Sequence, residues 1–315
     1  MTLRIILLAY TKDQHTNFMS GLKTALTSSG HTVRSIFQWG DPKTDTEFKT
    51  NYSDFDLFWI EEFQPDLIIS FNGYAKETFG VISYLAGRYK MMFVERGWLP
   101  QRGNIYIDSV GLGGRSSLAK RDLSSPTAYE SVINDCVESL YETTYKTDGH
   151  SELGDYILLP LQLDHDTSIV LDSPYFKTMQ SLVSFITRKF YNQKVVVRPH
   201  PLCMDIQFPP SVIVEKKKST LDLAKTAKAI IGINSTTLIE SLIHYRPTAL
   251  LGSGVLSSTP NIVFQGRAAL QHLDNILDFE PNRGAINATL FNLLNIQFPA
   301  NNVPERVIKE IELAV

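Results

Sequence analysis

The sequence predicts an α/β protein built from two Rossmann-like units that face a central cleft. Short apolar runs alternate with helical patterns along nearly the whole chain, and the alternation breaks once, in a glycine- and charge-rich stretch at residues 147–155. The 315 residues are enough for two hydrophobic cores. Because each pair of parallel strands needs a crossover, usually helical, the alternation favours doubly wound parallel sheets.

The first unit is expected to span residues 1–150. Its elements follow from apolar runs bounded by turn residues, such as Gly30 after the first helical pattern. The expected strands are residues 4–10, 31–37, 66–72 and 89–95. The expected helices are residues 15–28 and 75–88, with one more in the polar region after residue 118.

The second unit is expected to span residues 151–300, where the alternation restarts. The expected strands are residues 156–163, 194–201, 211–215, 229–234 and 248–252. The expected helices are residues 175–191, 221–227 and 237–244. Residues 301–315, with the run PERVIKEIELAV, form an amphipathic helix that we expect to pack back on the first unit.

Charge, cysteine content and hydropathy exclude several classes of protein. The formal charge is −3, from 30 basic and 33 acidic residues, so no global field attracts nucleic acid. Cys136 and Cys203 form neither a metal-binding spacing nor a disulfide framework, which fits a reducing cytoplasm. The N-terminal MTLRIILLAY is too short for a signal peptide, and no run approaches the roughly 20 apolar residues of a membrane span. We therefore expect a cytoplasmic protein with at most peripheral contact with the inner membrane.

One predicted strand ends in a cation and an imidazole. The run KVVVRPHP delivers Arg198 and His200 to the carboxyl end of the strand, and Pro199 and Pro201 stiffen the turn around the histidine. A lone histidine is more often structural than catalytic. A histidine between two prolines, however, is not helical and is a poor core residue, so we interpret this stretch as a phosphate contact.

A second strand end leads into a helix start rich in hydroxyl groups. In AIIGINSTTLIE, Asn234 ends the strand, and Ser235, Thr236 and Thr237 open a helix whose N–H groups can bind an anion. Glu240, one turn later, can accept hydrogen bonds from ribose hydroxyls. The alternative is a capping box of Thr237 and Glu240, which needs no ligand. Because parallel strands share a carboxyl edge, these groups and those of RPHP would surround one anion.

Acidic side chains follow two other predicted strands. In LLPLQLDHDTSI, Asp164 and Asp166 are interpreted either as carboxylates at the mouth of the cleft or as the start of a helix or turn. In FVERGWLPQRGNIYIDSVGLGGRSS, Glu95 and Arg96 end a strand and Asp108 precedes a glycine-rich loop. That loop lacks the spacing of a dinucleotide fingerprint, and an ordinary loop is the alternative.

Taken in order, four segments resemble the bacterial capsule polysaccharide and O-antigen retaining β-Kdo transferases, which transfer 3-deoxy-D-manno-oct-2-ulosonic acid (Kdo). The segments are ERGWLPQ…YIDSVGLGGRSS, LPLQLDHDTSI, RPHP and INSTTLIESLIHYRPT, and they run from about Glu95 to Pro247. The resemblance implies a GT-B fold, with the acceptor bound mainly by the first unit and the nucleotide by the second. It also implies CMP-Kdo as the donor, a saccharide or glycolipid as the acceptor, no metal or cofactor, and a single linkage formed.

The resemblance further implies roles for single residues. Asp166 would be the nucleophile of a double displacement, with Asp164 as the alternative, and Glu95 would serve in acid–base work or bind sugar hydroxyls. The residues implied in CMP binding are Arg198, His200, Asn234, Ser235, Thr236, Thr237 and Glu240. Those implied in sugar or acceptor binding are Arg96, Asp108, Gly113, Arg115 and Gln162. The candidates for the Kdo carboxylate are Arg96, Arg115 and Arg198.

Three other functions are compatible with these residues. An inverting CMP-sialic-acid transferase shares the His-Pro element and the hydroxyl-rich helix start. A UDP-sugar transferase of the GT-B fold would use a similar edge of the second sheet. A non-catalytic nucleotide- or glycan-binding module would account for motifs that are individually weak.

Overall fold

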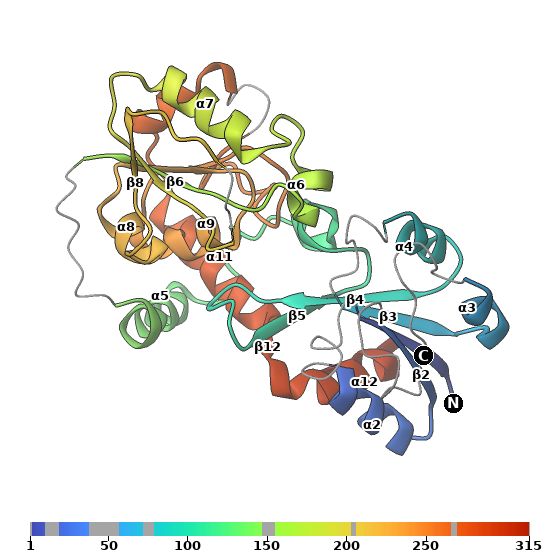
Figure 1. Ribbon diagram of the computed structural model, residues 1–315. Coiled ribbons are helices and arrows are strands. Elements are labelled where there is room, and N and C mark those ends of the chain that lie inside the picture. Colours follow the sequence, from blue (N-terminus) through green and yellow to red (C-terminus); the bar gives the residue numbers. More distant parts are fainter. Residues whose placement is uncertain are drawn as a thin grey trace. The chain divides into compact units, whose positions relative to one another are not determined.

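Figure 1 shows a computed structural model of the chain, which describes residues 2–9, 19–37, 57–71, 79–146, 155–202, 206–265 and 270–314. Its contacts divide the chain into two compact units. Unit 1 comprises Met1–Gly97, Gln101–Leu112 and Gln297–Val315, and unit 2 comprises Trp98–Pro100 and Gly113–Ile296. Cys203 and the expected helical residues 15–18 and 75–78 lie outside the described residues.

Unit 1 is built on a six-stranded sheet with the order β12-β5-β4-β3-β1-β2. The strands are β1 (Arg4–Ala9), β2 (Thr32–Phe37), β3 (Leu67–Phe71), β4 (Met91–Arg96), β5 (Asn104–Asp108) and β12 (Phe298–Pro299). Neighbouring strands among β1 to β4 pair in parallel, as the sequence predicts. Strand β5 runs antiparallel to both β4 and β12.

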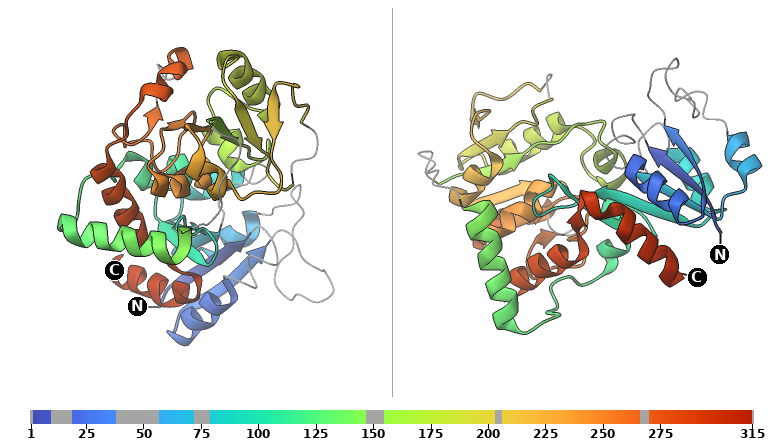
Figure 2. Two further views of the ribbon diagram at one scale, coloured as in Figure 1. Left: turned by 90° about the vertical axis from the view of Figure 1, so that its left-hand side faces the viewer. Right: turned by 90° about the horizontal axis from the view of Figure 1, so that it is seen from below.

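Helices cover both faces of the unit 1 sheet. Side chains alternate along β1, so Ile5 and Leu7 join one apolar cluster while Ile6 and Leu8 join the other. The first cluster is covered by α2 (Ser20–Ser28) and α12 (Val303–Ala314), which lie side by side (Figures 1 and 2). The second cluster is covered by α3 (Leu57–Phe63) and α4 (Phe79–Ala86).

Unit 2 is built on a fully parallel six-stranded sheet with the order β11-β10-β9-β6-β7-β8. The strands are β6 (Ile157–Pro160), β7 (Val195–Arg198), β8 (Val212–Val214), β9 (Ala229–Gly232), β10 (Thr248–Leu250) and β11 (Phe264–Gln265). Counted from β6, this is the 3-2-1-4-5-6 order of dinucleotide-binding folds, whose strand order reverses between β6 and β9. The carboxyl ends of β6 and β9 therefore mark the topological switch point.

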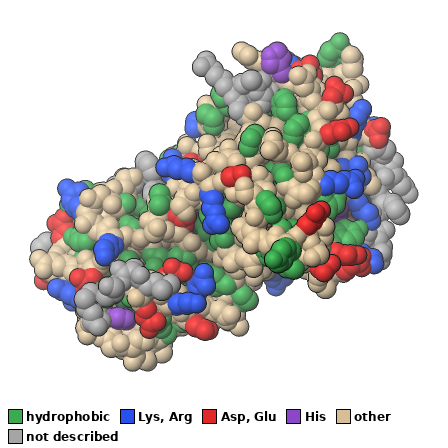
Figure 3. Space-filling view, turned by 180° about the vertical axis from the view of Figure 1, so that it is seen from behind, with side chains coloured by type: hydrophobic (Ala, Val, Ile, Leu, Met, Phe, Trp, Pro, Cys, Tyr) green, Lys and Arg blue, Asp and Glu red, His purple; other side chains and the backbone are tan. Residues whose placement is uncertain are grey.

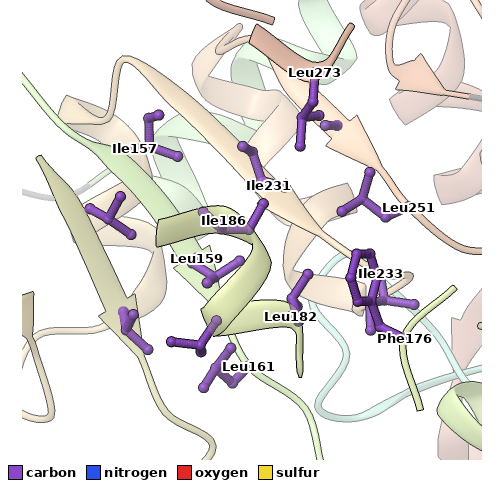
Figure 4. Close-up of a cluster of buried hydrophobic side chains, with 14 of the residues drawn as sticks. Ile157, Leu159, Leu161, Phe176, Leu182, Ile186, Ile231, Ile233, Leu251 and Leu273 are labelled. Carbon is purple, nitrogen blue, oxygen red and sulfur yellow. The ribbon is translucent and has the colours of Figure 1, made fainter. Parts of the chain in front are cut away.

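One core cluster of unit 2 packs on the side of its sheet that α7 (Met179–Lys189) covers. Aliphatic side chains of β6, β7, β9 and β10 meet those of α7 and of the 3₁₀ segment Leu273–Asp278 (Figure 4). The described part of unit 2 also contains α5 (Glu130–Leu140), α6 (Thr167–Asp172), α8 (Thr220–Thr226), α9 (Thr236–Ser241) and α11 (Arg283–Ile296). The buried residues of α7 recur at helical spacing, which explains the periodicity of this segment in the sequence.

The structure differs from the sequence-based expectation in several places, among them the start of unit 2, helix α11 and strand β5. Apart from Trp98–Pro100, unit 2 starts at Gly113 rather than near residue 150, because α5 packs against α11 (Figure 2). Neither the 14-residue helix α11 nor the strand β5 was among the expected elements. Among the described residues, no helix is both long and apolar enough to cross a bilayer.

Candidate functional site

Two amide side chains, hydrogen-bonded to each other, lie at the switch point of unit 2. Gln162 follows β6 and Asn234 follows β9, and Gln162 Nε2 donates to Asn234 Oδ1 over 3.0 Å. The same Nε2 donates to Ser168 Oγ at 3.0 Å. Ligands of doubly wound sheets bind outside the carboxyl ends of the strands at this point, so this is the candidate site in unit 2.

Asn234, which follows β9, also forms hydrogen bonds with the segments that follow β6 and β10. Its Nδ2 donates to the backbone carbonyl of Ser168 and to that of Ser253, each at 3.0 Å. Both amide donors of Asn234 are thus used within the protein. We call Gln162, Asp166, Ser168, Asn234 and Ser253 the switch-point network. The expectation that Asn234 contacts CMP stays a prediction.

Asp166 enters the network as the N-cap of α6. Its Oδ1 accepts from the Ser168 N–H at 2.9 Å and from Ser168 Oγ at 2.7 Å, while the side chain lies at the exposed edge. Asp164 instead accepts at Oδ1 from the Met179 N–H at 2.6 Å, which ties the loop after β6 to the start of α7. Both carboxylates therefore have a structural contact, and the nucleophile role of either stays a prediction.

Arg198 and His200 lie at the end of β7, next to β6. Arg198 is opposite Pro160 in the strand register, and its Nε and Nη1 donate to the carbonyls of Lys218 and Pro199 at 2.9 and 2.7 Å. His200 Nδ1 accepts from the Leu202 N–H at 3.2 Å. A neutral imidazole that accepts at Nδ1 carries its proton on Nε2, so His200 can donate a hydrogen bond to an anion.

The start of α9 differs in detail from the expected capping box. Ser235, not Thr237, is the N-cap, and its Oγ accepts from the Thr237 N–H at 3.3 Å. Thr236 is the first residue of α9, and Glu240 accepts at 3.3 Å from the hydroxyl of Tyr145, which follows α5. Burial, and then Glu240, raise the pKa of Tyr145, so its hydroxyl keeps its proton. The interpretation of Thr237 and Glu240 as a capping box is therefore wrong.

Gly113 and Arg115 form a 3₁₀ turn (Gly113–Arg115) beside the end of α6. Arg115 Nε lies 3.6 Å from Asp172 Oδ1, and a Cβ on Gly113 would lie 3.5 Å from Asp172 Oδ2. The Asp172 carbonyl accepts from the Ser253 N–H at 2.8 Å, which joins this turn to the switch-point network.

Unit 1 holds the remaining candidates at the β4–β5 pair. Glu95 is half-buried near the end of β4 and accepts from the Arg96 N–H at 2.8 Å, while Arg96 is exposed. Asp108 ends β5 and is buried, and its Oδ1 accepts from the Val110 and Gly111 N–H groups at 2.7 and 3.0 Å. Through these hydrogen bonds, Asp108 stabilises the start of the loop that follows β5. Its expected part in acceptor binding stays a prediction.

Groups of metal ligands give no further site in the part of the chain that the structure describes. No three His, Cys, Asp or Glu residues gather there in a way that could hold a metal ion. Acidic and basic side chains are interspersed on the face seen in Figure 3.

Residues 137–275 match the model of the family described as "Capsule polysaccharide biosynthesis protein". Over this stretch, the chain is similar to that family. The match includes the switch-point network, the β7 end and the α9 start, and it excludes Glu95, Asp108 and Arg115. The resemblance seen in the sequence is thus confirmed as a likeness to capsule polysaccharide biosynthesis proteins.

One curated relative and two solved structures extend the comparison. Protein FixF of Sinorhizobium fredii (strain NBRC 101917 / NGR234) is 24% identical over 207 residues, which are 59% of this chain and 48% of FixF, about half of the relative's length. The β-Kdo 2,7 transferase of Thermosulfurimonas dismutans KpsC matches with a TM-score of 0.58 and 14% identity, over 99% of this chain and 100% of that one. The KpsC β-Kdo 2,4 transferase matches with a TM-score of 0.56 and 12% identity, over 92% and 90%. Both likenesses confirm the α/β fold class of the GT-B type.

Sequence reasoning missed four residues that the structure places at the site. They are Tyr145, Ser168, Asp172 and Ser253. Only Ser168 carried a signal in the sequence, since it lies two residues after a capping aspartate. The other three are defined by contacts with residues far along the chain.

Proposed function

We propose that this chain transfers Kdo from CMP-β-Kdo to a saccharide or glycolipid acceptor, with retention of configuration, during surface polysaccharide synthesis. One observation carries the proposal: the stretch that matches the capsule family contains the switch-point network together with His200 and Ser235, on one edge of one sheet. The names of the two KpsC structures, both β-Kdo transferases, support Kdo as the sugar. No metal or cofactor is part of the proposal. The proposed localisation is cytoplasmic, with at most peripheral association with the inner membrane.

The proposed reaction has two displacements. The carboxylate of Asp166 attacks the anomeric carbon of Kdo, the bond from that carbon to the phosphate oxygen breaks, and CMP leaves with the bonding electrons. The acceptor hydroxyl then attacks the same carbon, which releases the Asp166 carboxylate, and the hydroxyl proton passes to a base. Glu95 and a phosphate oxygen are the two candidates for that base.

The leaving CMP develops negative charge, which the edge of the unit 2 sheet is equipped to receive. His200 carries its donor on Nε2 because Nδ1 accepts from Leu202. Ser235 Oγ accepts from Thr237, so its own proton is available for a phosphate oxygen. One preorganised donor of this kind typically contributes about 3–4 kcal/mol in the transition state.

The decisive experiment uses Asp166→Asn and freshly generated CMP-Kdo. Asparagine keeps an oxygen that can accept from Ser168, whereas alanine also removes the N-cap of α6, which costs about 1 kcal/mol. We expect wild-type protein to gain the mass of one Kdo in intact-mass spectra. Asp166→Asn should gain none, should lose transfer, and should still bind CMP with near wild-type thermal stability.

Asp164→Asn is the matched control, because this carboxylate lies two residues away and bonds to Met179 instead. Loss of the adduct in the Asp164 variant alone would move the nucleophile role to that residue. An inverted product anomer in NMR spectra would contradict the double displacement. Stabilisation by UDP but not CMP would favour a UDP-sugar transferase, and CMP binding with no transfer to any acceptor would favour a binding module.

A further inference from the structure

Asp172, the last residue of α6, carries a carboxylate that the proposed reaction does not use. Its side chain is only 10% exposed. Arg115 Nε lies 3.6 Å from one carboxylate oxygen, and the Gly114 N–H donates to the carboxylate. Gly113 lies near the other oxygen, since a Cβ added there would be in van der Waals contact with it at 3.5 Å.

The main chain at Asp172 connects the 3₁₀ turn to the switch-point network. The Asp172 carbonyl accepts from the Ser253 N–H, and the Ser253 carbonyl accepts from Asn234 Nδ2 at 3.0 Å. A Cβ on Gly114 would lie 2.6 Å from the Ser253 Cβ, so the turn and the Ser253 loop are in close contact. Asp172 thus fixes Arg115 relative to the switch point through packed backbone.

Burial of this carboxylate is unfavourable for stability. Desolvation raises the pKa of Asp172 to about 6, although Arg115, the Gly114 N–H and Lys177 lower it; Asp166 raises it further. A neutral side chain of the same size would fill the space without that penalty. Perturbed carboxyl groups of this kind gather at functional sites.

We propose that Asp172 is a positioning residue for the donor sugar: its carboxylate holds the Arg115 guanidinium and the Gly113–Gly114 backbone beside the switch-point network, so that Arg115 binds the carboxylate of an anionic sugar. The sugar carboxylate comes from the proposed function, on which this inference rests. A guanidinium has five N–H donors, so a guanidinium that contacts one carboxylate through Nε can also bind a second carboxylate.

The first test is kinetic. With CMP-Kdo as the donor, Asp172→Asn should raise KM about 10- to 100-fold, the range expected when one charge-assisted hydrogen bond is lost, and should change kcat much less. In wild-type protein KM should rise as the pH falls through about 6, because Asp172 becomes protonated and releases Arg115. The variant should lose this dependence. Arg115→Gln and the double variant Arg115→Gln/Asp172→Asn should share one KM, since Asp172 acts through Arg115.

Asp274→Asn is the matched control. It breaks the Lys189–Asp274 ion pair, 2.7 Å long, on another surface of unit 2, and KM should stay unchanged. A wild-type KM and pH profile in Asp172→Asn would overturn the inference, as would losses that multiply in the double variant.

A spectroscopic measurement separates this inference from the proposed function. The ¹⁵N resonance of Arg115 Nε should titrate with a midpoint near pH 6 in wild-type protein and stay flat in Asp172→Asn, with no substrate present. If that titration is seen but CMP-Kdo is not used, the contact is right and the proposed donor is wrong. A flat resonance in wild-type protein would overturn the positioning role, whatever the activity.

Discussion

Gly114 shows how tightly single residues are packed beside the candidate site. An added Cβ would lie 2.6 Å from the Ser253 Cβ and 2.9 Å from the Ser253 backbone, and backbone cannot move aside cheaply. We expect Gly114→Ala to lower the free energy of unfolding by about 1–3 kcal/mol, the usual effect of overpacking. Urea unfolding measures this.

Gly284→Ala is the control for Gly114→Ala. Gly284 lies exposed in the first turn of α11, and its added Cβ would meet only Asn282 Oδ1, at 3.5 Å. Alanine there should be neutral or should stabilise by up to about 1 kcal/mol, because it restricts the unfolded chain. Equal losses at both positions would show that contact with Ser253 is not the cause.

Residue types alone predict the candidate site only in part. The polar side chains after β6, β7 and β9 were predicted, because parallel strands bring their carboxyl ends to one edge. The same residue types also cap helices, and the structure finds Asp166 and Ser235 in caps. Asp172 was missed because its partner Arg115 lies in a distant part of the sequence.

At the scale of elements, most strands were predicted, whereas β5, β11, β12 and α11 were not. Strands such as β7 and β9 are unbroken runs of buried aliphatic residues. In α11 the polar residues Thr289 and Asn292 are also buried. Asn292 Nδ2 donates to the carbonyls of Leu123 and Ser125 at 2.9 Å, and its Oδ1 accepts from Thr127 at 2.5 Å. Tertiary hydrogen bonds thus satisfy a polar residue that obscures the helical period in the sequence.

The C-terminal helix α12 completes the core of unit 1, although it lies at the other end of the sequence from β1. Val307 is fully buried in the cluster that also holds Leu7. Val307→Ala should lower the free energy of unfolding by about 2 kcal/mol, from lost burial and the cavity left behind. Lys309→Ala, exposed on the same helix, should change it by less than about 0.5 kcal/mol.

Two further variants assign the Val307 effect to a unit. Leu7→Ala removes core from unit 1, and Leu293→Ala removes core from unit 2. If the two units unfold in separate transitions, Val307→Ala should shift the transition that Leu7→Ala shifts. A shift that follows Leu293→Ala instead would contradict the packing of α12 in unit 1.

At the scale of the whole molecule, the sequence predicted the two-unit α/β organisation because alternation of strands and helices is repeated over the chain. The strand orders were not predicted, because they depend on which strands pair in space. In unit 2 the observed order locates the site at the β6 and β9 ends. In unit 1 the corresponding reversal lies between β1 and β3, and the segments that follow both strands lie outside the described residues.

Two buried groups of unit 2 should give the stability of the molecule opposing dependences on pH. Burial raises the pKa of Asp172 from 3.8 to about 6. The folded protein then holds a proton that the unfolded chain has lost, so this group adds stability as the pH falls from 6 towards 4. Burial, with Arg246 and Lys225, lowers the pKa of His244 from 6.5 to about 4. Here the unfolded chain takes up the proton first, so stability falls as the pH falls from 6.5 towards 4.

Differences between variants isolate each of these groups, because all other titrations cancel. The free energy of unfolding of wild-type protein minus that of Asp172→Asn should rise by on the order of 2–3 kcal/mol between pH 7 and pH 4. The same difference for His244→Gln should fall by a similar amount, because glutamine stays neutral in both states. Urea unfolding at half-unit pH steps measures both curves. Parallel curves for the two variants would contradict the burial of one of the groups, and a flat Asp172 curve would remove the energetic reason for assigning that carboxylate a function.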